Sequence, residues 1–192
     1  MTTLHYLAYG SNLHPLRLRE RVPSAELLGV VPLSGREVVF HKISPDGSSK
    51  CDLVESGRRA LAFGALYAMD RGHLDALDRF EGLGSGYDRR DFPLMFRGRA
   101  LRPFTYRASP THVNPALKPF DWYRDIVAAG ARFFDLPAWY HRNLAEAPAQ
   151  ADPDPERQTT HAALLARLQE FPPAASHARN RESTASRHHA AC

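Results

Sequence analysis

The hydrophobic and polar positions along the chain predict short strands that alternate with amphipathic helices. Residues 5–9 form a compact β-favouring run that stops at Gly10, and Asn12 is expected to cap a helix that begins directly afterwards. The polar side of this helix, which includes Arg17 and Arg21, is expected to face water.

Five further runs are rich in β-branched and aromatic residues and predict strands: residues 25–31, 37–43, 59–69, 87–96 and 100–108. Residues 32–35 separate the first two runs, and the tight connection at 97–99 indicates that the last two form a hairpin. Gly64, inside the third run, suggests close contact with another backbone. Residues 44–57 are polar and rich in turn signals, so we expect a mobile loop there.

The second half of the chain is predicted to be mainly helical. Residues 120–134 predict one helix, and a short helix is expected after it, with Asp135 as its cap and Pro137 in its first turn. Residues 159–171 predict one more amphipathic helix, preceded by a break at residues 152–155. Together these elements favour an α+β fold, with a mixed, mostly antiparallel sheet or small β-barrel flanked by helices.

Composition limits the classes of protein that the chain can represent. It has 192 residues, of which 43% are hydrophobic and 24% charged, as is typical of a globular domain. The formal net charge of +4 comes from dispersed arginines and predicts no nucleic-acid surface. Two cysteines, Cys51 and Cys192, give no disulfide framework, and no run resembles a membrane span or a signal peptide. We therefore expect a cytoplasmic protein that binds neither nucleic acid nor membrane.

The junction at Gly10 is the first candidate for chemistry. A strand that turns through glycine into a helix leaves backbone N–H groups unpaired, and these groups suit a carboxylate or another anion. The alternative is a strand–turn–helix without a ligand, because such turns are common.

The helix predicted over residues 70–81, which Asp70 is expected to cap, carries the second candidate. Its buried stripe is expected to contain three residues: Leu74, Leu77 and Phe80. Glu81 points about 20° from Leu74 and about 40° from Leu77 on a helical wheel, whereas Asp78 lies at the edge of the stripe and is expected to be wet. A carboxylate on the buried side would have a raised pKa and could exchange protons near neutral pH. The alternative is a helix that has already ended, leaving Glu81 in solvent.

The chain resembles the γ-glutamylcyclotransferase family in an ordered set of motifs. The first is Tyr-Leu-Ala-Tyr-Gly-Ser-Asn-Leu at residues 6–13, followed by Leu-Asp-Ala-Leu-Asp-Arg-Phe-Glu-Gly at 74–82 and Ser-Gly-Tyr at 85–87. The set continues with Tyr-Arg-Asp-Ile-Val-Ala-Ala-Gly-Ala at 123–131 and Leu-Pro-Ala-Trp-Tyr at 136–140. The resemblance covers residues 5–146. It therefore implies a catalytic domain over residues 1–146 and a C-terminal extension over 147–192, with one helix and then a disordered end.

The resemblance also implies a β-barrel with a cavity at its mouth and a division of roles among residues. Glu81 corresponds to the catalytic acid, and Tyr123 to a tyrosine that helps to enclose the substrate. The γ-glutamyl group is held by the residues of the first motif: Tyr6, Leu7, Ala8, Tyr9, Gly10, Ser11 and Asn12. The substrate's own α-amino group would attack its γ-carbonyl and release 5-oxoproline and an amine, with Glu81 moving the proton. No cofactor and no metal is required, and no His partner assigns Ser11 as a nucleophile.

Other interpretations remain open. The domain could bind γ-glutamyl ligands without turnover, or act on γ-glutamylamines or a carrier-linked γ-glutamyl group. Nucleotide binding at Gly10–Asn12 is disfavoured because the loop lacks the phosphate-binding spacing and a lysine. His188 and His189 could bind metal only adventitiously. The expected partner is a small γ-glutamyl substrate, and the protein is expected to be a monomer or a homodimer.

Overall fold

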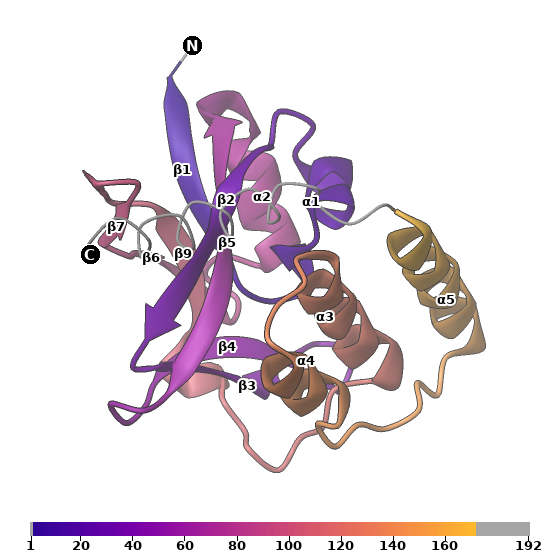
Figure 1. Ribbon diagram of the computed structural model, residues 1–192. Coiled ribbons are helices and arrows are strands. Elements are labelled where there is room, and N and C mark those ends of the chain that lie inside the picture. Colours follow the sequence, from indigo (N-terminus) through magenta and orange to yellow (C-terminus); the bar gives the residue numbers. More distant parts are fainter. Residues whose placement is uncertain (1, 172–192) are drawn as a thin grey trace, which may run out of the picture.

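The computed structural model describes residues 2–171, and a five-stranded sheet forms its centre (Figure 1). The strands are arranged in the order β2-β5-β1-β9-β6. Their bounds are β1 (Thr3–Ala8), β2 (Glu26–Ser34), β5 (Leu61–Asp70), β6 (Tyr87–Asp91) and β9 (Phe104–Ala108). Strands β1 and β9 are parallel, with Tyr6 opposite Phe104, and the other neighbours are antiparallel.

The α+β architecture with a mixed, mostly antiparallel sheet is therefore confirmed, but the closed barrel is wrong. Strands β2 and β6 are the two edges of an open sheet in the described part of the chain. After β2 the chain turns at Gly35 into β3 (Arg36–Ile43), which pairs with β4 (Ser49–Glu55) in a separate two-stranded sheet. Strands β3 and β4 therefore do not extend or close the central sheet.

Strand β4 also corrects the mobile loop expected over residues 44–57. The segment is irregular only at the turn around Gly47 and after Glu55, and β4 buries Cys51, Asp52 and Leu53. The Asp52 carboxylate accepts hydrogen bonds from the backbone N–H groups of Leu53 at 2.8 Å and Ala108 at 2.9 Å. A polar residue can be buried when its hydrogen bonds are satisfied, so polarity alone wrongly indicated a loop.

Prolines account for two further differences from the expected strands. Pro32 lies inside β2, not in a turn, and it is tolerated there because β2 is an edge strand. Pro93 and Pro103 split the predicted strands 87–96 and 100–108, which yields the small hairpin of β7 (Leu94–Phe96) and β8 (Arg99–Leu101). The prediction that these two segments form a hairpin is confirmed.

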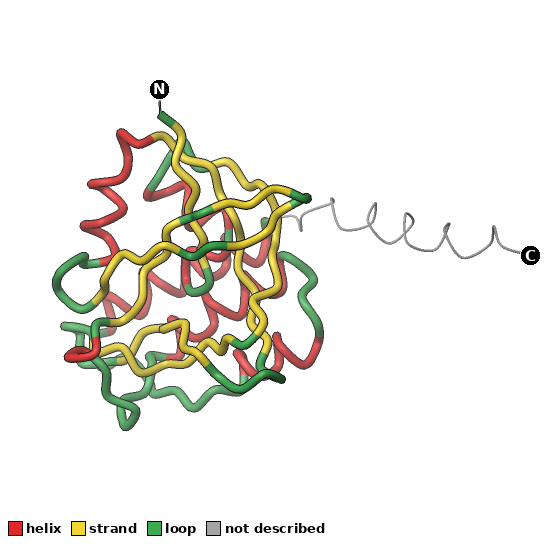
Figure 2. The backbone as a smooth tube through the Cα atoms, turned by 90° about the vertical axis from the view of Figure 1, so that its left-hand side faces the viewer, coloured by secondary structure: helices red, strands yellow, loops and turns green. Residues whose placement is uncertain are grey.

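The helices gather mainly on one side of the central sheet, so in Figure 2 they lie largely behind the strands. The α-helices are α1 (Pro15–Arg21), α2 (Leu74–Glu81), α3 (Asp121–Phe133), α4 (Ala138–Ala145) and α5 (Pro155–Glu170). Three short 3₁₀ turns accompany them: η1 (Ser11–Leu13), η2 (Arg71–His73) and η3 (Pro110–His112). Helix α3 is almost fully buried and packs against η1, α4 and α5.

Gly130 explains how α3 approaches η1 so closely. A Cβ atom at this position would lie 2.9 Å from the Leu13 Cβ and 3.2 Å from the His14 backbone nitrogen. Gly64 has the same function in β5, where a Cβ would lie 3.2 Å from the Ala8 carbonyl oxygen. The close backbone contact expected at Gly64 is thus confirmed.

The helix caps differ from those expected at two of three positions. Asp70 does cap the η2 turn, because its side chain accepts a hydrogen bond from the Gly72 N–H. His14, not Asn12, caps α1, with Nδ1 accepting from the Leu16 N–H at 3.1 Å. Pro137, not Asp135, stands at the cap position of α4. Asn12 is consequently free to direct its amide elsewhere.

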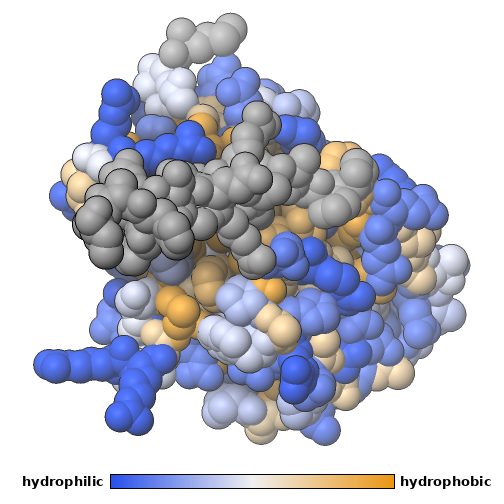
Figure 3. Space-filling model, in the orientation of Figure 1, coloured by the Kyte–Doolittle hydropathy of each residue, from blue (hydrophilic) through white to orange (hydrophobic). Residues whose placement is uncertain are grey.

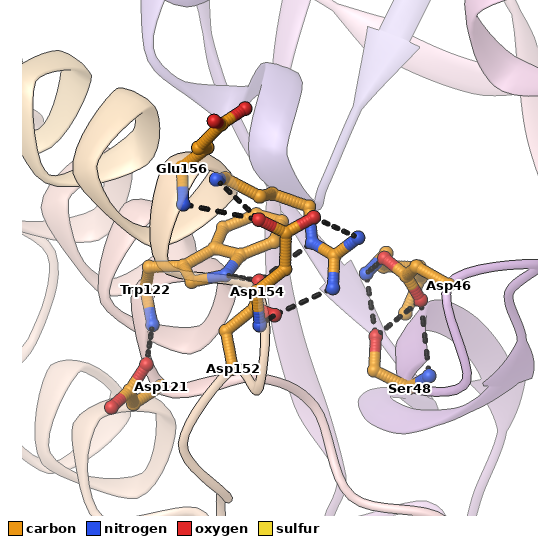
Figure 4. A network of polar contacts seen from close by, with 9 residues as sticks. Asp46, Ser48, Asp121, Trp122, Asp152, Asp154 and Glu156 are labelled. Carbon is orange, nitrogen blue, oxygen red and sulfur yellow. Dashed lines mark hydrogen bonds and ion pairs between the residues drawn. The ribbon is translucent and has the colours of Figure 1, made fainter.

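The residues expected to break the chain at 152–155 instead begin α5, four residues before the predicted helix start. Asp154 caps the helix by accepting from the N–H groups of Glu156 and Arg157, both at 3.0 Å. Figure 4 shows how this segment joins α3: the buried Asp152 carboxylate accepts from the Trp122 indole at 2.8 Å and from two nitrogens of Arg157. The division at residue 146 stays a prediction, and residues 172–192 lie outside the described part.

The surface is mixed in character. On the face drawn in Figure 3, hydrophilic residues separate small apolar patches. The exposed large apolar side chains of the described residues are Phe80, Leu83, Met95 and Trp139. Between residues 2 and 171 no helix has both the length and the apolar character needed to span a membrane.

Candidate active site

Glu81 is the last residue of α2, and its side chain points inward as the helical wheel predicts. Only 15% of the side chain is exposed, and Gly82 then ends the helix with a left-handed φ of 68°. The rest of the predicted stripe is mixed: Leu77 is fully buried, whereas Phe80 is 58% exposed, which corrects its placement in the core. Asp78, which was expected to face solvent, is mostly buried and accepts hydrogen bonds from the Tyr106 hydroxyl and Arg89.

The bend after β1 lies directly opposite this carboxylate. The Leu13 N–H donates to the Gly10 carbonyl at 2.9 Å and closes the 3₁₀ turn η1. The turn buries Asn12, whose Nδ2 donates to Glu81 Oε1 at 2.6 Å and to the Tyr6 hydroxyl at 3.3 Å. The bend and the acid, which lie 69 residues apart in the sequence, are therefore in direct contact.

One cavity contains both features. Of the sequence-predicted site residues, seven line it: Tyr6, Tyr9, Gly10, Ser11, Asn12, Glu81 and Tyr123. Leu7 and Ala8 do not line it, because both side chains pack into the hydrophobic core. The lining also includes three residues that sequence reasoning did not assign: Cys51, Tyr87 and Tyr106. The cavity volume is about 20 Å³, which is room for about one water molecule.

Buried tyrosines fix the cavity walls. Tyr9 donates its hydroxyl hydrogen to the Tyr106 carbonyl at 2.5 Å, and Tyr87 donates to the Cys51 carbonyl. The Tyr123 hydroxyl accepts from the Cys51 N–H at 3.2 Å. Each hydroxyl thus connects two different elements, which holds β4, β9 and α3 around the same space.

Burial controls the protonation states in the cavity. It raises the pKa of Glu81, while Arg21, the Asn12 amide, Lys42 and Arg17 act in the opposite direction without cancelling that effect. The Glu81 carboxyl therefore holds its proton more strongly than an exposed glutamic acid, as a proton-exchanging group near neutral pH requires. Burial raises the pKa of the Cys51 thiol to about 12, so this cysteine is not a thiolate nucleophile at neutral pH.

Arg21 and Arg17 correct the expectation that the polar side of α1 faces water. Only 16% of each side chain is exposed. Arg21 NH1 lies 3.0 Å from Asn12 Oδ1 and 3.3 Å from Glu81 Oε1. The sequence gave no signal for this contact, because a seven-residue helix shows no clear apolar face and the position of α2 is not encoded locally.

Metal ligation finds no support in the described part of the chain. Across residues 2–171, no group of three or more His, Cys, Asp or Glu side chains is placed to hold a metal ion. His188 and His189 lie outside the described residues. The chemistry available at the cavity is thus that of one buried carboxylate, several neutral phenols and the backbone of the Gly10 bend.

The structure is thus a small α+β domain in which a buried carboxylate lies beside a glycine bend. The chain belongs to the family described as "Gamma-glutamyl cyclotransferase, AIG2-like", whose sequence profile matches residues 6–125. A γ-glutamylcyclotransferase of Bos taurus is 26% identical over 146 residues, which cover 72% of this chain and 76% of that protein.

Solved structures show the same fold. A structure titled "Gamma-glutamyl cyclotransferase" has a TM-score of 0.72 at 22% identity and covers 84% of this chain and 99% of its own. The uncharacterized human protein loc79017 has a TM-score of 0.70 at 23% identity, with the same coverage. These likenesses extend beyond the matched motifs.

Proposed function

We propose that this protein is a γ-glutamylcyclotransferase that converts a γ-glutamyl amide into 5-oxoproline and a free amine or amino acid. The observation that carries the proposal is the placement of Glu81 and the Gly10–Asn12 bend in one cavity, with the carboxylate 2.6 Å from the Asn12 amide. Membership in the γ-glutamyl cyclotransferase, AIG2-like family supports the reaction class.

Glu81 acts as the general base and then as the general acid. It accepts a proton from the substrate's α-ammonium group, whose nitrogen then attacks the γ-carbonyl carbon and closes a five-membered ring. The tetrahedral intermediate collapses by breaking the bond between the γ-carbon and the amide nitrogen, and Glu81 returns the first proton to the leaving nitrogen. The ring nitrogen loses its second proton to the leaving amine, which departs as an ammonium ion. A carboxyl with a raised pKa suits both transfers.

The Gly10–Asn12 bend binds the charged parts of the substrate. Its backbone N–H groups hold the α-carboxylate or stabilise the oxyanion that develops on the γ-carbonyl oxygen. Tyr123 helps to enclose the substrate, and its hydroxyl lies near Gly10. Confinement in the folded, ring-closing shape lowers the entropic part of the barrier.

Substrate binding requires that the cavity widens. A space of about 20 Å³ is far smaller than a γ-glutamyl group. The cavity must therefore enlarge by movement of its lining side chains, and substrate binding is coupled to that movement.

The direct test is release of 5-oxoproline from γ-glutamyl-alanine by purified protein. Glu81→Gln keeps the size of the side chain and should abolish turnover while circular dichroism shows an unchanged fold. Glu26→Gln is the matched control, because Glu26 is an exposed residue at the start of β2. Retained turnover in Glu81→Gln would refute the assigned role.

A substrate panel then identifies the leaving group. The panel compares γ-glutamyl amino acids, γ-glutamylamines and γ-glutamyl groups linked to a larger carrier, all measured by 5-oxoproline. Binding across this panel without any turnover would instead favour a γ-glutamyl-binding module. We expect a cytoplasmic enzyme that works without cofactor or metal, as a monomer or a homodimer.

A further inference from the structure

Arg21 occupies a position that the reaction scheme above does not use. It is the last residue of α1, and its guanidinium reaches two acceptors on two other elements, Asn12 Oδ1 at 3.0 Å and Glu81 Oε1 at 3.3 Å. The guanidinium carbon also lies 5.3 Å from the centre of the Phe80 ring. Three contacts thus hold one side chain that is 16% exposed.

The contacts to Glu81 are unequal between its two oxygens. Asn12 Nδ2 and Arg21 NH1 both donate to Oε1, at 2.6 Å and 3.3 Å. Among the described residues, neither a hydrogen bond nor an ion pair is formed with Oε2. An oxygen that already accepts two hydrogen bonds is the poorer proton acceptor, so Oε2 is the oxygen left for the substrate.

We infer that Arg21 is a positioning residue for this reaction: together with Asn12 it holds Glu81 by Oε1 and so presents Oε2 to the substrate's amino group. The inference rests on the proposed function for the identity of the substrate. The placement of Arg21 itself rests only on the contacts described above.

The charges around Glu81 give this placement a measurable consequence. The cations that face the carboxylate are Arg17 and Arg21 from α1 and Lys42 from β3. The other titratable groups around it are Tyr6, Cys51, Tyr87, Tyr106 and Tyr123, which burial keeps neutral by raising their pKa. Arg21 is the strongest of the influences that lower the pKa of Glu81. Without it, Glu81 would stay protonated to higher pH and the base form would be lost earlier as pH falls.

The experiment measures kcat/KM for γ-glutamyl-alanine from pH 5 to 9 in the unaltered protein, Arg21→Gln and Arg21→Lys. In Arg21→Gln we expect the acid limb to move upward by roughly one pH unit, because a nearby positive charge is lost. Arg21→Lys should keep the acid limb closer to its original position but lower kcat with little change in KM, because the charge is retained and the geometry is not. Arg19→Gln is the matched control, since Arg19 is exposed on the same helix and donates to the Ala25 carbonyl.

A second readout does not depend on turnover. Carboxyl ¹³C resonances of glutamate-labelled protein report the pKa of Glu81 directly, and the resonance absent from Glu81→Gln identifies it. A higher Glu81 pKa in Arg21→Gln supports the inference, and an unchanged pKa or an unchanged acid limb overturns it. If the unaltered protein releases no 5-oxoproline but the pKa still shifts, the proposed function fails and the positioning of Glu81 by Arg21 stands.

Discussion

Two of the carboxylates that pair with arginine, Asp152 and Glu81, are held in contrasting ways. Asp152 binds Arg157 through both oxygens, at 2.5 Å and 2.6 Å, and also accepts from the Trp122 indole (Figure 4). Glu81 meets Arg21 at a single oxygen, 3.3 Å away. Each arginine also lies over a phenylalanine ring, Arg157 over Phe120 at 5.2 Å and Arg21 over Phe80 at 5.3 Å.

The pKa values of these two carboxyl groups are shifted in opposite directions from their ordinary values. The Arg157 hydrogen bonds hold the pKa of Asp152 well below its usual range, whereas burial raises the pKa of Glu81 despite Arg21. The difference arises because Asp152 is covered mainly by its own hydrogen-bond donors, while Glu81 lies deep in the protein with fewer of them. An arginine neighbour alone therefore does not determine whether the pKa of a carboxyl rises or falls; the number of its hydrogen-bond donors and the depth of its burial do.

The largest expected effect is a difference in catalytic activity between variants of Glu81 and variants of Asp152. We expect Glu81→Gln to lower kcat for 5-oxoproline release by roughly 10²–10⁴-fold, because a proton-transfer group is lost. Asp152→Asn should retain turnover per folded molecule, because Asp152 does not line the cavity. A steady-state assay on both variants checks this contrast, and equal losses would remove it.

Removal of the phenylalanine ring that each arginine covers should change the free energy of unfolding by different amounts in the two regions, with the larger loss at Phe120. Phe120 is 2% exposed, so Phe120→Ala should destabilise the protein by about 3 kcal/mol and lower Tm by roughly 6–12 °C. Thermal unfolding followed by circular dichroism gives the value. A shift below about 2 °C would show that this part of the chain contributes little to the cooperative unit.

Charge removal should change stability with opposite signs at the two sites. Asp152 has a lowered pKa in the folded state, so its stabilisation is present above its unfolded pKa and is lost as pH falls through the folded value. Asp152→Asn should therefore lower Tm at pH 7 by about 5 °C. It should also reduce the decrease of Tm that the unaltered protein shows as the pH falls.

Glu81 has a raised folded pKa, so its stabilisation is present below its unfolded pKa and is lost as pH rises through the folded value. Glu81→Gln should leave Tm at pH 7 unchanged or slightly higher. Paired melts at pH 4 and pH 7 test both signs, and a lower Tm for Glu81→Gln at pH 7 would contradict the comparison.

The smallest effect is expected at Phe80. Its ring is 58% exposed, so Phe80→Ala should leave Tm within about 1 °C, and loss of the cation–π contact should change kcat/KM only about two- to fivefold. A change as large as that of Arg21→Gln would show that Phe80, and not the contact to Asn12, holds the guanidinium.

The sequence was informative where a local pattern was sufficient. The helical wheel of α2 identified the inward direction of Glu81, and the glycine after β1 marked the bend. Arg21 could not be identified, because whether the polar side of α1 faces water or a cavity depends on where α2 packs. Strand β4 was missed for a related reason: one of the hydrogen-bond donors that satisfy the buried Asp52 is the Ala108 N–H, which comes from a distant strand. Barrel closure could not be judged either, because β3 pairs with the next strand, β4, which was expected to be a loop.

The absence of a side chain at Gly130 affects the contact between Asn12 and Glu81. Because η1 rests against α3 at this point, the thickness of that helix determines how far Asn12 can reach toward Glu81. A single methyl group added there would collide with Leu13 and displace the bend that carries Asn12. The contact that orients the Glu81 carboxylate thus depends on a position in α3 that carries no side chain.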